Sequence, residues 1–364
     1  MSAPDLDALL SPDEWERAAQ QALAPAAHAY IAGGATDEIT LADNRAAWSR
    51  LALRPRALVG VGTRDASIEL LGRRRPHPVL IAPTAYQRLA HPEGECDTAR
   101  GAAVTDTIMC LSTLATSSPE DVAAAAPGAP RWFQLYVFSD RGVSREFVAR
   151  AADSGFEALV VTVDLTLLGV RERELRQGEA HPAAADVASA AAAGVRGAVT
   201  PASLQALVDP DLRWSDIERF VAESPLPVLV KGIVRPDDAR RAAEHGVAGV
   251  IVSNHGGRQL DTVLAGADAL PAIADEVGGE IDVLVDGGIR RGTDIVKALA
   301  LGARAVCVGR PIVYGLAVGG AAGVQRVIEL LLGEFDNALG LSGCPVATAL
   351  DRSFVTRAPW AATR

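Results

Sequence analysis

The stretch "DVLVDGGIRRGTDIVKALALGARAVCVGRP", residues 282–311, decides the fold. It opens with a short run rich in β-branched residues and passes through paired glycines into a helical pattern that starts near Thr293. It ends in a second β-rich run, "AVCV" at 305–308. A strand, a crossover helix and a second strand in so short a stretch predict a βαβ unit with parallel strands.

The same alternation extends outward through most of the chain. Amphipathic stretches such as "SREFVARAADSG" at 144–155 separate the apolar runs and end in a glycine suited to a left-handed cap. Eight strand–helix units over roughly 250 residues favour a TIM (β/α)8 barrel over an open doubly wound sheet, which usually needs fewer strands. We expect strands at 78–83, 107–113, 132–138, 158–164, 227–233, 249–255, 282–288 and 305–311.

Two further segments complete the expected α/β architecture. "SPDE" at 11–14 resembles a capping box, which predicts a helix running from there towards Tyr30, where "AGG" ends it. We therefore expect N-terminal helices over about 10–50, ahead of a barrel over about 75–345, within a single domain of residues 1–364.

The interval after the fourth expected strand is abnormally long. Residues 180–202 are Ala-rich and show no periodic pattern, and we interpret about 172–212 as a mobile loop that serves as a lid. A disordered surface excursion is the alternative.

Composition limits the function. A 364-residue chain with 49% hydrophobic residues supports a large core, and a formal charge of −10 argues against binding nucleic acid or anionic membranes by bulk charge. The four cysteines, Cys96, Cys110, Cys307 and Cys344, form no CxxC pair, so we expect reduced thiols and a cytoplasmic protein. The N-terminal residues show no signal-peptide pattern, and we expect neither export nor a membrane span.

Polar residues follow the expected strands at their carboxyl ends, which is where barrel enzymes place their functional groups. For any one of them, an ordinary hydrogen-bonded side chain is the better interpretation. The argument rests on all eight ends carrying such groups. They are Pro83, Thr84, Ala85, Ser112, Gln134, Tyr136, Thr162, Asp164, Lys231, Ser253, His255, Asp286, Arg290, Gly309 and Arg310.

Glycines and arginines follow the last two expected strands. Gly287 and Gly288 precede a helix start, while Gly309 and Arg310 end the final strand. Small residues let backbone N–H groups approach a ligand, and a helix N-terminus with an arginine attracts an anion. Two ordinary turns are the alternative, but their joint occurrence favours a phosphate-bearing ligand. We expect no metal site.

Four ionisable side chains stand where acid–base chemistry needs them. His255 has Gly256 and Gly257 beside it and Arg258 three positions later, so an imidazole base and a guanidinium that holds a carboxylate lie close together. Asp164 is placed to stabilise the imidazolium. Lys231 suits stabilisation of a developing anion, with a Schiff-base lysine as the rival role.

Several colinear blocks carry a family resemblance. From about residue 10 to residue 345 the chain resembles the FMN-dependent 2-hydroxy-acid oxidases and dehydrogenases, the family that includes glycolate oxidase, lactate oxidase, mandelate dehydrogenase and hydroxymandelate oxidase. The matching blocks are "AYIAGGATDEITLADNR", "IAPTAYQRLAHPEGE", "LSTLATSS", "FQLYV", "VTVD", "VLVKGI", "SNHGGRQLD", "DGGIRRGTD", "KALALGA" and "GRP".

The resemblance implies a TIM barrel that holds FMN across its mouth, and it assigns residues to each part of the site. It implies His255 as the base, Tyr136 near the substrate hydroxyl, and Tyr30, Arg171 and Arg258 as the carboxylate clamp. For the flavin ring and ribityl chain it implies Pro83, Thr84, Ala85, Ser112, Gln134, Thr162, Lys231 and Ser253. For the phosphate and ribityl hydroxyls it implies Asp286, Gly287, Gly288, Arg290, Gly309 and Arg310.

Two departures from the family bear on the substrate, and a third position bears on the electron acceptor. Leu114 stands where glycolate oxidases have tryptophan, which predicts a substrate bulkier than glycolate. Glu174, Gln177 and Glu179 replace a common aspartate, asparagine and phenylalanine, so we expect the lid to pack differently. Ala85 follows the oxidase-like "PTA" pattern, which points towards oxygen as acceptor.

The expected reaction is oxidation of an (S)-2-hydroxy acid, lactate-, mandelate- or medium-chain-like, to the 2-oxo acid, with oxygen giving hydrogen peroxide. His255 removes a proton, from the α-carbon or from the hydroxyl, as two electrons pass to FMN. The resemblance also implies a homotetramer. Three alternatives stay open: a dehydrogenase that passes electrons to a quinone or another carrier, a redox-neutral FMN-dependent isomerase, and a flavin-binding barrel without chemistry.

Overall fold

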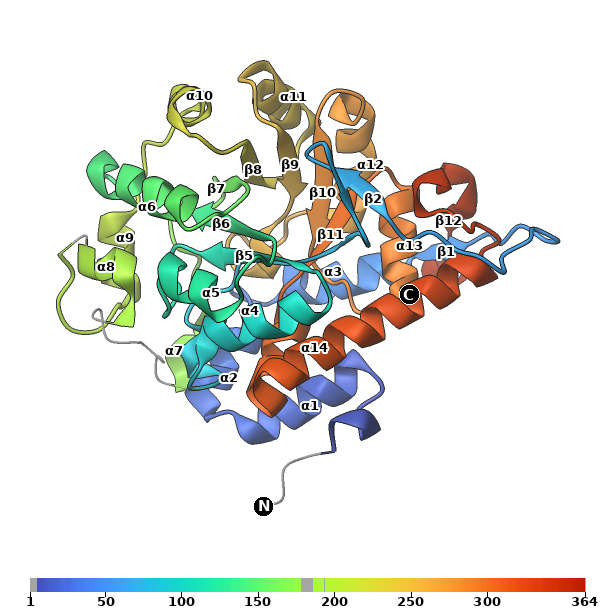
Figure 1. Cartoon of the computed structure of the whole chain (residues 1–364), viewed down its shortest axis with the longest axis horizontal. Coiled ribbons are helices and arrows are strands. Elements are labelled where there is room, and N and C mark those ends of the chain that lie inside the picture. Colours follow the sequence, from blue (N-terminus) through green and yellow to red (C-terminus); the bar gives the residue numbers. More distant parts are fainter. Residues whose placement is uncertain (1–4, 178–185, 193, 364) are drawn as a thin grey trace.

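Eight parallel strands close into a barrel at the centre of the molecule (Figure 1). The computed structural model describes residues 5–177, 186–192 and 194–363. Going round the barrel, the order is β10, β11, β4, β5, β6, β7, β8 and β9, after which the ring closes. The strands are β4 (Val79–Ile81), β5 (Ile108–Ser112), β6 (Arg131–Leu135), β7 (Leu159–Thr162), β8 (Val228–Ile233), β9 (Gly249–Val252), β10 (Asp282–Asp286) and β11 (Ala305–Val308). All eight expected strands and the TIM barrel are confirmed.

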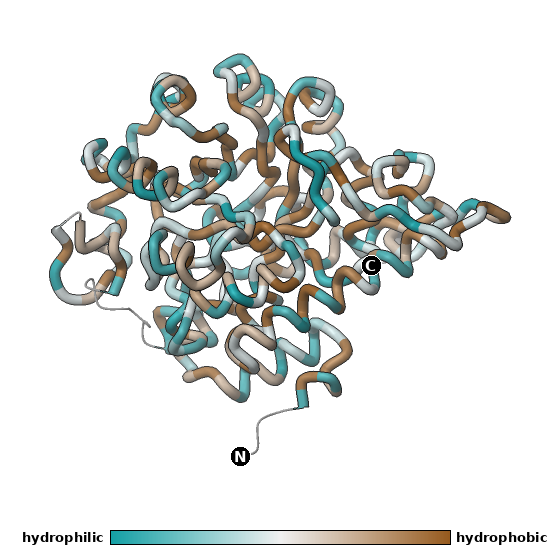
Figure 2. The backbone as a smooth tube through the Cα atoms, in the orientation of Figure 1, coloured by the Kyte–Doolittle hydropathy of each residue, from teal (hydrophilic) through white to brown (hydrophobic). Residues whose placement is uncertain are grey.

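The strands are apolar along their whole length because both of their faces are covered. Figure 2 shows hydrophobic residues concentrated on them. One face fills the barrel interior with side chains such as Leu80, Trp132 and Leu229, and Ile68 and Leu70 belong to the same interior cluster. These last two lie on β2 (Ile68–Leu70), which pairs with β3 (Arg73–Arg75). The interior is thus a packed core rather than a channel.

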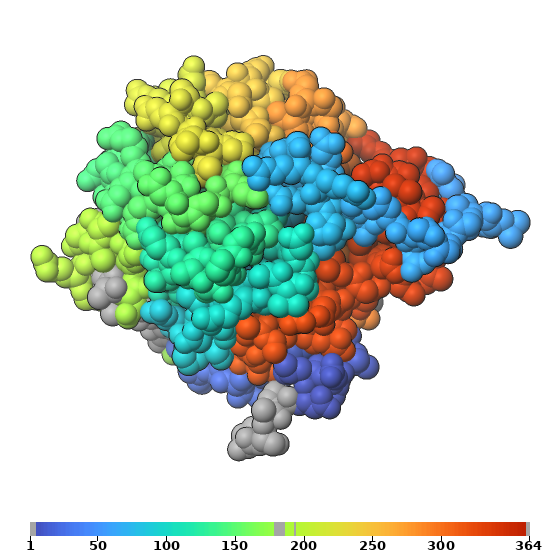
Figure 3. Space-filling model, viewed as in Figure 1, coloured from blue at the N-terminus to red at the C-terminus, as the bar shows by residue number. Residues whose placement is uncertain are grey.

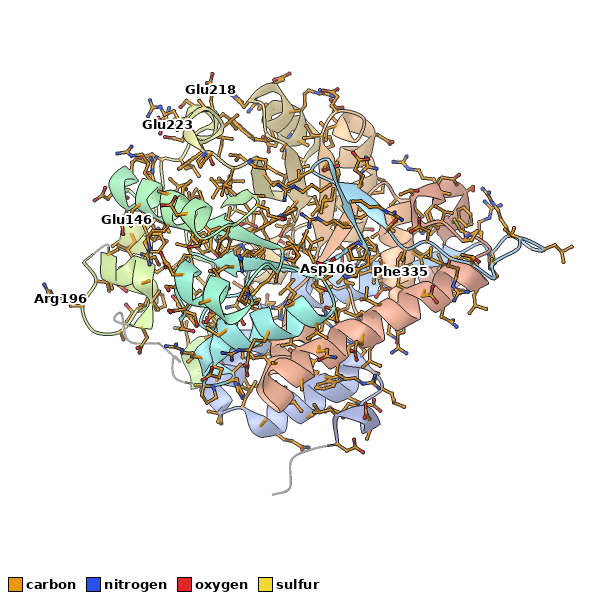
Figure 4. All side chains as sticks on the ribbon, viewed as in Figure 1. Asp106, Glu146, Arg196, Glu218, Glu223 and Phe335 are labelled. Carbon is orange, nitrogen blue, oxygen red and sulfur yellow. The ribbon has the colours of Figure 1, made fainter. Side chains whose placement is uncertain are left out.

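Amphipathic helices cover the outer face of the barrel. The predicted glycine caps are present, because Gly155, Gly246 and Gly302 have φ angles of 74°, 78° and 105°. Charged side chains such as Glu218 and Glu223 point outward, away from the barrel (Figure 4). The helices are α4 (Gly94–Val104), α5 (Pro119–Ala125), α6 (Arg141–Asp153), α10 (Trp214–Glu223), α11 (Pro236–Glu244), α12 (Gly266–Val277), α13 (Gly292–Ala300) and α14 (Arg310–Leu341).

The last of these helices, α14, is long and apolar. Within the described ranges it is the one helix with the length and composition needed to cross a membrane. It packs against α1, α4 and α13, and side chains such as Val324 and Leu331 are buried there (Figure 1). Gly319 and Gly320 depart from helical dihedral angles and kink it. Its apolar character is therefore matched by its packing within the fold.

The N-terminal helices differ from the expectation in one respect. The capping box of Ser11 and Glu14 is present and starts α1 (Pro12–Ala22). The single helix predicted up to Tyr30 is wrong, because α2 (Pro25–Ala32) is a separate helix. Proline disfavours helical angles in the residue before it, and Ala24 is accordingly extended, with ψ of 146°. A third helix, α3 (Ile39–Ser49), follows.

The interval between β7 and β8 is not patternless where it is described. It forms α7 (Glu172–Gln177), α8 (Ala188–Ala192) and α9 (Pro201–Leu207), of which α9 starts with a Thr200 cap. Val187 and Val199 are buried, so this interval packs onto the barrel. Its short Ala-rich helices hid the pattern. Residues 178–185 and 193 of the expected mobile loop, including Glu179, lie outside the described residues.

Smaller elements surround the barrel. An arm formed by residues 54–66 projects from the side of the molecule (Figure 3). Leu58 within this arm is fully exposed, and the Arg56 N–H donates to the Ser342 carbonyl. The remaining elements are β1 (Leu51–Leu53), paired with β12 (Val355–Arg357), and the short 3-10 helices η1 (Leu6–Ala8), η2 (Gln87–Leu89), η4 (His255–Gly257), η5 (Ala347–Ala349), η6 (Arg352–Phe354) and η7 (Pro359–Thr363).

Candidate active site

A cavity of about 380 Å³ opens at the carboxyl ends of the barrel strands. Its volume is in the range of sites that hold small molecules and cofactors. The expected site residues that line it are Tyr30, Pro83, Thr84, Ala85, Leu114, Tyr136, Thr162, Arg171, Lys231, His255, Arg258, Asp286, Gly287, Gly288, Arg290, Gly309 and Arg310. Of the remaining four, Ser112, Gln134 and Ser253 are buried and Asp164 is partly buried, and all four contact residues that line the cavity or adjoin it.

His255 is held between two partners. Its Nδ1 lies 2.8 Å from Asp164 Oδ1, and its Nε2 lies 3.3 Å from the Tyr136 hydroxyl. Burial lowers the pKa of His255, although Asp164 opposes that shift, so the imidazole is neutral near pH 7. Burial would raise the pKa of Asp164, but its interaction and hydrogen bond with His255, together with the nearby Lys231 cation, lower it. An ionised Asp164 only accepts, so Nδ1 carries the proton and Nε2 presents a lone pair to the cavity.

The backbone around His255 is strained. His255 has a φ of 59°, a left-handed conformation that is uncommon for any residue other than glycine. Gly256 and Gly257 continue with φ of 63° and 74°. A Cβ on Gly256 would lie 3.0 Å from an Arg310 nitrogen, and one on Gly257 would lie 2.7 Å from the Leu41 amide nitrogen. The two glycines therefore make room for neighbouring elements of the protein.

Lys231 is a buried cation in a network of oxygen atoms. Its Nζ donates to Ser253 Oγ at 2.8 Å and lies 3.1 Å from Asp286 Oδ2. Burial alone would lower the pKa of Lys231, but the carboxylates of Asp286 and Asp164 outweigh it and raise the pKa. A Schiff-base lysine needs a neutral amine, so the structure favours the electrostatic role.

Two arginines from different loops meet at one side of the cavity. Arg258 donates to the carbonyls of Tyr30 and Gly33, and its guanidinium lies over the Tyr30 ring, 4.8 Å from the ring centroid. Arg171 donates to the carbonyl of Arg258 at 3.3 Å. Glu174 lies 3.1 Å from Arg258 and 3.7 Å from Arg171, measured between carboxylate oxygen and guanidinium nitrogen. This group is a clamp suited to a carboxylate.

The phosphate side contains two further arginines. Arg290 donates to the Ile289 carbonyl, and burial lowers its pKa. Burial lowers the pKa of Arg310 to about 10, and Arg310 donates to the carbonyls of Ile31, Gly33 and Gly256. Arg310 therefore also ties the N-terminal segment to the His255 loop, a role that its place in the "GRP" turn did not reveal. Buried cations of this kind are stabilised by a bound anion.

The polar atoms around the cavity fit FMN. Within the described residues, Gln134 Nε2, Asp286 Oδ1 and Arg290 Nε are buried without a hydrogen-bond partner. Such atoms are costly unless a ligand satisfies them. A flavin ring offers acceptors for the amide of Gln134, ribityl hydroxyls are donors for Asp286, and a phosphate accepts from Arg290. Lys231 would lie beside the flavin ring.

One wall of the substrate side of the cavity is apolar. Leu114 and Tyr136 line it as expected, and Leu168, Val199 and Leu204 join them. Leu168, Val199 and Leu204 all come from the interval between β7 and β8. Because that interval had no periodic pattern, its share of the pocket wall was not predictable.

Sequence reasoning also missed a bracket that spans the site. The side-chain amides of Asn44 on α3 and Asn254 form two reciprocal hydrogen bonds of 2.9 and 2.8 Å. Asp261 accepts from the backbone amides of Thr40 and Ile39 at the start of α3. Trp48 at the other end of α3 donates to the Gly287 carbonyl. Asn254 and Asp261 stand in the quoted block "SNHGGRQLD", which is the signal that points to them.

Comparisons with known proteins identify the family of the chain. A model of a family described as FMN-dependent dehydrogenase matches residues 19–357. An L-lactate oxidase from Nostoc sp. is 48% identical, covering 94% of this chain and 96% of its own length. Glycolate oxidase from Spinacia oleracea is 44% identical, covering 96% and 95%. A crystal structure of mandelate oxidase superposes with a TM-score of 0.87 at 40% identity, covering 96% of this chain and 98% of its own.

A barrel with a His–Asp base, an arginine clamp and a cradle for a phosphorylated flavin defines a flavin-dependent oxidoreductase of small hydroxy acids. The chain belongs to the FMN-dependent dehydrogenase family, in the group of FMN-dependent 2-hydroxy-acid oxidases. Its cofactor is FMN.

Proposed function

We propose that the protein oxidises (S)-2-hydroxy acids bulkier than glycolate to 2-oxo acids and passes the electrons to oxygen, giving hydrogen peroxide. The observation that carries this proposal is the meeting of the His255–Asp164 pair with the arginine clamp in one cavity. The base and the clamp lie close enough to act on the two ends of a small hydroxy acid.

Each residue has a defined task in this proposal. The substrate carboxylate binds Arg258 and Arg171, with the Tyr30 hydroxyl as a further donor. This places the α-carbon and its hydroxyl towards His255 and Tyr136. His255 Nε2 takes a proton from the substrate, and Asp164 stabilises the resulting imidazolium. Bound FMN supplies the two-electron acceptor, and the Lys231 cation stabilises the negative charge that develops in the site.

The proposed size of the substrate rests on the apolar wall. Leu114, Leu168 and Leu204 offer no hydrogen-bond donor to a substrate side chain, and burying an alkyl or aryl group against them is favourable by about 0.8 kcal/mol per CH₂. A lactate-, mandelate- or medium-chain-like acid gains this energy, whereas glycolate has no side chain to bury.

Oxygen as the acceptor is supported by the "PTA" pattern at Ala85 and by the relatives, which carry the name oxidase. A dehydrogenase that uses another carrier remains the second candidate, because a flavocytochrome b2 structure with pyruvate bound superposes with a TM-score of 0.88 at 36% identity. The arginine clamp suits a small acid rather than a diphosphate, which disfavours the isomerase.

A panel of (S)-2-hydroxy acids with graded side chains tests the proposal. The FMN-loaded enzyme is mixed anaerobically with glycolate, lactate, 2-hydroxypentanoate or mandelate, and bleaching of the flavin absorbance is followed. Oxygen or a quinone is then admitted. We expect faster bleaching by the larger acids, then rapid reoxidation by oxygen with peroxide formed in equal amount. Turnover without bleaching indicates an isomerase, reoxidation by the quinone alone indicates a dehydrogenase, and fastest bleaching by glycolate contradicts the size assignment.

We further propose a homotetramer in the cytoplasm. The exposed apolar part of the arm formed by residues 54–66 supports association between copies, since Leu58 and Val59 are exposed there. Four unpaired cysteine thiols support a reducing compartment.

A further inference from the structure

A carboxylate of the chain already lies between the two arginines of the clamp. Glu174 belongs to α7, and its side chain is only 11% exposed. One of its carboxylate oxygens, Oε1, is 3.1 Å from an Arg258 nitrogen and 3.7 Å from an Arg171 nitrogen. Glu174 therefore contributes a negative charge beside the place where the proposed function puts the substrate carboxylate.

The net charge of the clamp is one positive charge. Arg171 and Arg258 contribute two positive charges and Glu174 one negative charge. Burial raises the pKa of Tyr30, so its phenol stays neutral. The adjacent Arg173 pairs with Glu38, and Arg310, which also reaches the Gly33 carbonyl, is assigned to the phosphate. The excess of one positive charge matches a single carboxylate.

The clamp keeps donors for a substrate while Glu174 is in place. A guanidinium has five N–H donors. The contacts of Arg258 with the carbonyls of Tyr30 and Gly33 and with Glu174 use three of them. A substrate carboxylate can therefore bind the clamp without displacing Glu174.

We infer that Glu174 restricts the enzyme to 2-hydroxy monocarboxylates and rejects 2-hydroxy dicarboxylates. This inference rests on the proposed function. A second carboxylate on the substrate would meet a clamp whose excess positive charge is already neutralised by the first carboxylate, next to the apolar side chains of Leu114, Leu168 and Leu204. An ionised group buried without a partner is strongly disfavoured. Removing the negative charge of Glu174 raises the net charge of the clamp from one to two positive charges, which favours a dianion.

Matched pairs of acids test this role. The ligands are 2-oxopentanoate and 2-oxoglutarate, which have the same chain length and differ in the second carboxylate, and their binding to the oxidised FMN-loaded enzyme is measured by calorimetry. The corresponding 2-hydroxy acids are used for flavin reduction. In Glu174→Gln, which keeps the shape of the side chain, we expect the ratio of Kd values to shift by about tenfold or more towards the dicarboxylate.

Two further variants separate charge from packing. Glu172→Gln removes the same charge from α7 at an exposed position that pairs with Arg176, and its ratio should equal that of the unmodified enzyme. Glu174→Asp keeps the charge, and its ratio should stay within a few-fold. An unchanged ratio in Glu174→Gln, or an equal shift in Glu174→Asp or Glu172→Gln, overturns the inference. If none of the 2-hydroxy acids reduces the flavin of the unmodified enzyme, the proposed function fails instead.

Discussion

The protonation states of the catalytic residues depend on the carboxylates that contact them rather than on the side chains alone. His255 is made neutral by burial, and Asp164 fixes which of its nitrogens carries the proton. Lys231 is kept charged by Asp286 against the effect of burial. A neutral base and a charged cation thus coexist in one cavity because His255 is hydrogen-bonded to Asp164, while Asp286 and Asp164 together keep Lys231 protonated.

Replacing Asp164 by asparagine should expose this dependence. Loss of the carboxylate removes the group that raises the pKa of His255, so burial lowers that pKa further. Since activity requires the neutral imidazole, the acid limb of the kcat/KM profile should move to lower pH, and kcat should fall by about 10²–10⁴-fold because the imidazolium is less stabilised. Stopped-flow flavin reduction across pH measures both effects, and an acid limb that moves to higher pH contradicts the assignment.

At the residue scale, the sequence predicted the residues that stand at strand ends. His255, Lys231 and Asp286 each follow a recognisable apolar run, so the barrel geometry brings them together. The contact of Glu174 with the clamp was not predictable, because it depends on how α7 packs, and no apolar periodicity marks that short helix.

Among the elements, α3 lies outside the barrel but contacts two of the loops that form the site. It contacts the His255 loop through Asn44 and Asp261, and the Gly287 turn through Trp48. The backbone of Asn44 is so close to Gly288 that a Cβ there would lie 1.8 Å from the Asn44 carbonyl oxygen. One helix thus contacts both the loop that carries the base and the turn on the phosphate side.

Asn44→Ala should loosen this bracket. It removes two buried hydrogen bonds to Asn254, and a cost of about 1–3 kcal/mol in the free energy of unfolding is expected. Because α3 also holds the Gly287 turn, FMN should dissociate more readily, as measured by fluorescence of released flavin. Ser49→Ala, at the exposed end of the same helix, is the control. Equal FMN affinity in the two variants contradicts the role of the bracket.

Helices and strands were predicted correctly where the sequence carries a clear hydrophobic pattern. All eight strands were identified because each is an apolar run bounded by turn residues. The break at Pro25 was missed although proline signals it, since the capping signal at Ser11 was extended too far. The helices between β7 and β8 were missed because alanine gives no contrast between a buried and an exposed face.

At the scale of the whole molecule, the arm is the most exposed apolar feature described. Leu58 is fully exposed and has a φ of 56°, a conformation in which aspartate is better tolerated than leucine. The packing of a single chain therefore does not explain why an apolar residue occupies position 58.

Leu58→Asp should separate the proposed tetramer into smaller species without destabilising the single chain. The charge enters an apolar contact between copies, which is costly, while no contact within the chain is lost. Light scattering after size-exclusion chromatography gives the mass, with Leu58→Met as the control that keeps the apolar surface. A monomeric unmodified protein, or an unchanged tetramer in Leu58→Asp, contradicts the proposal.

The bracket formed by α3 also has a consequence for the order of events during synthesis. Asn44 leaves the ribosome long before Asn254, which is 210 residues further along the chain, and Arg310 follows later still. Contacts of such long sequence separation form late, since the entropy of the intervening chain must be lost first. We therefore expect the N-terminal helices to dock only after the barrel has closed, so that cofactor capture awaits the completed chain.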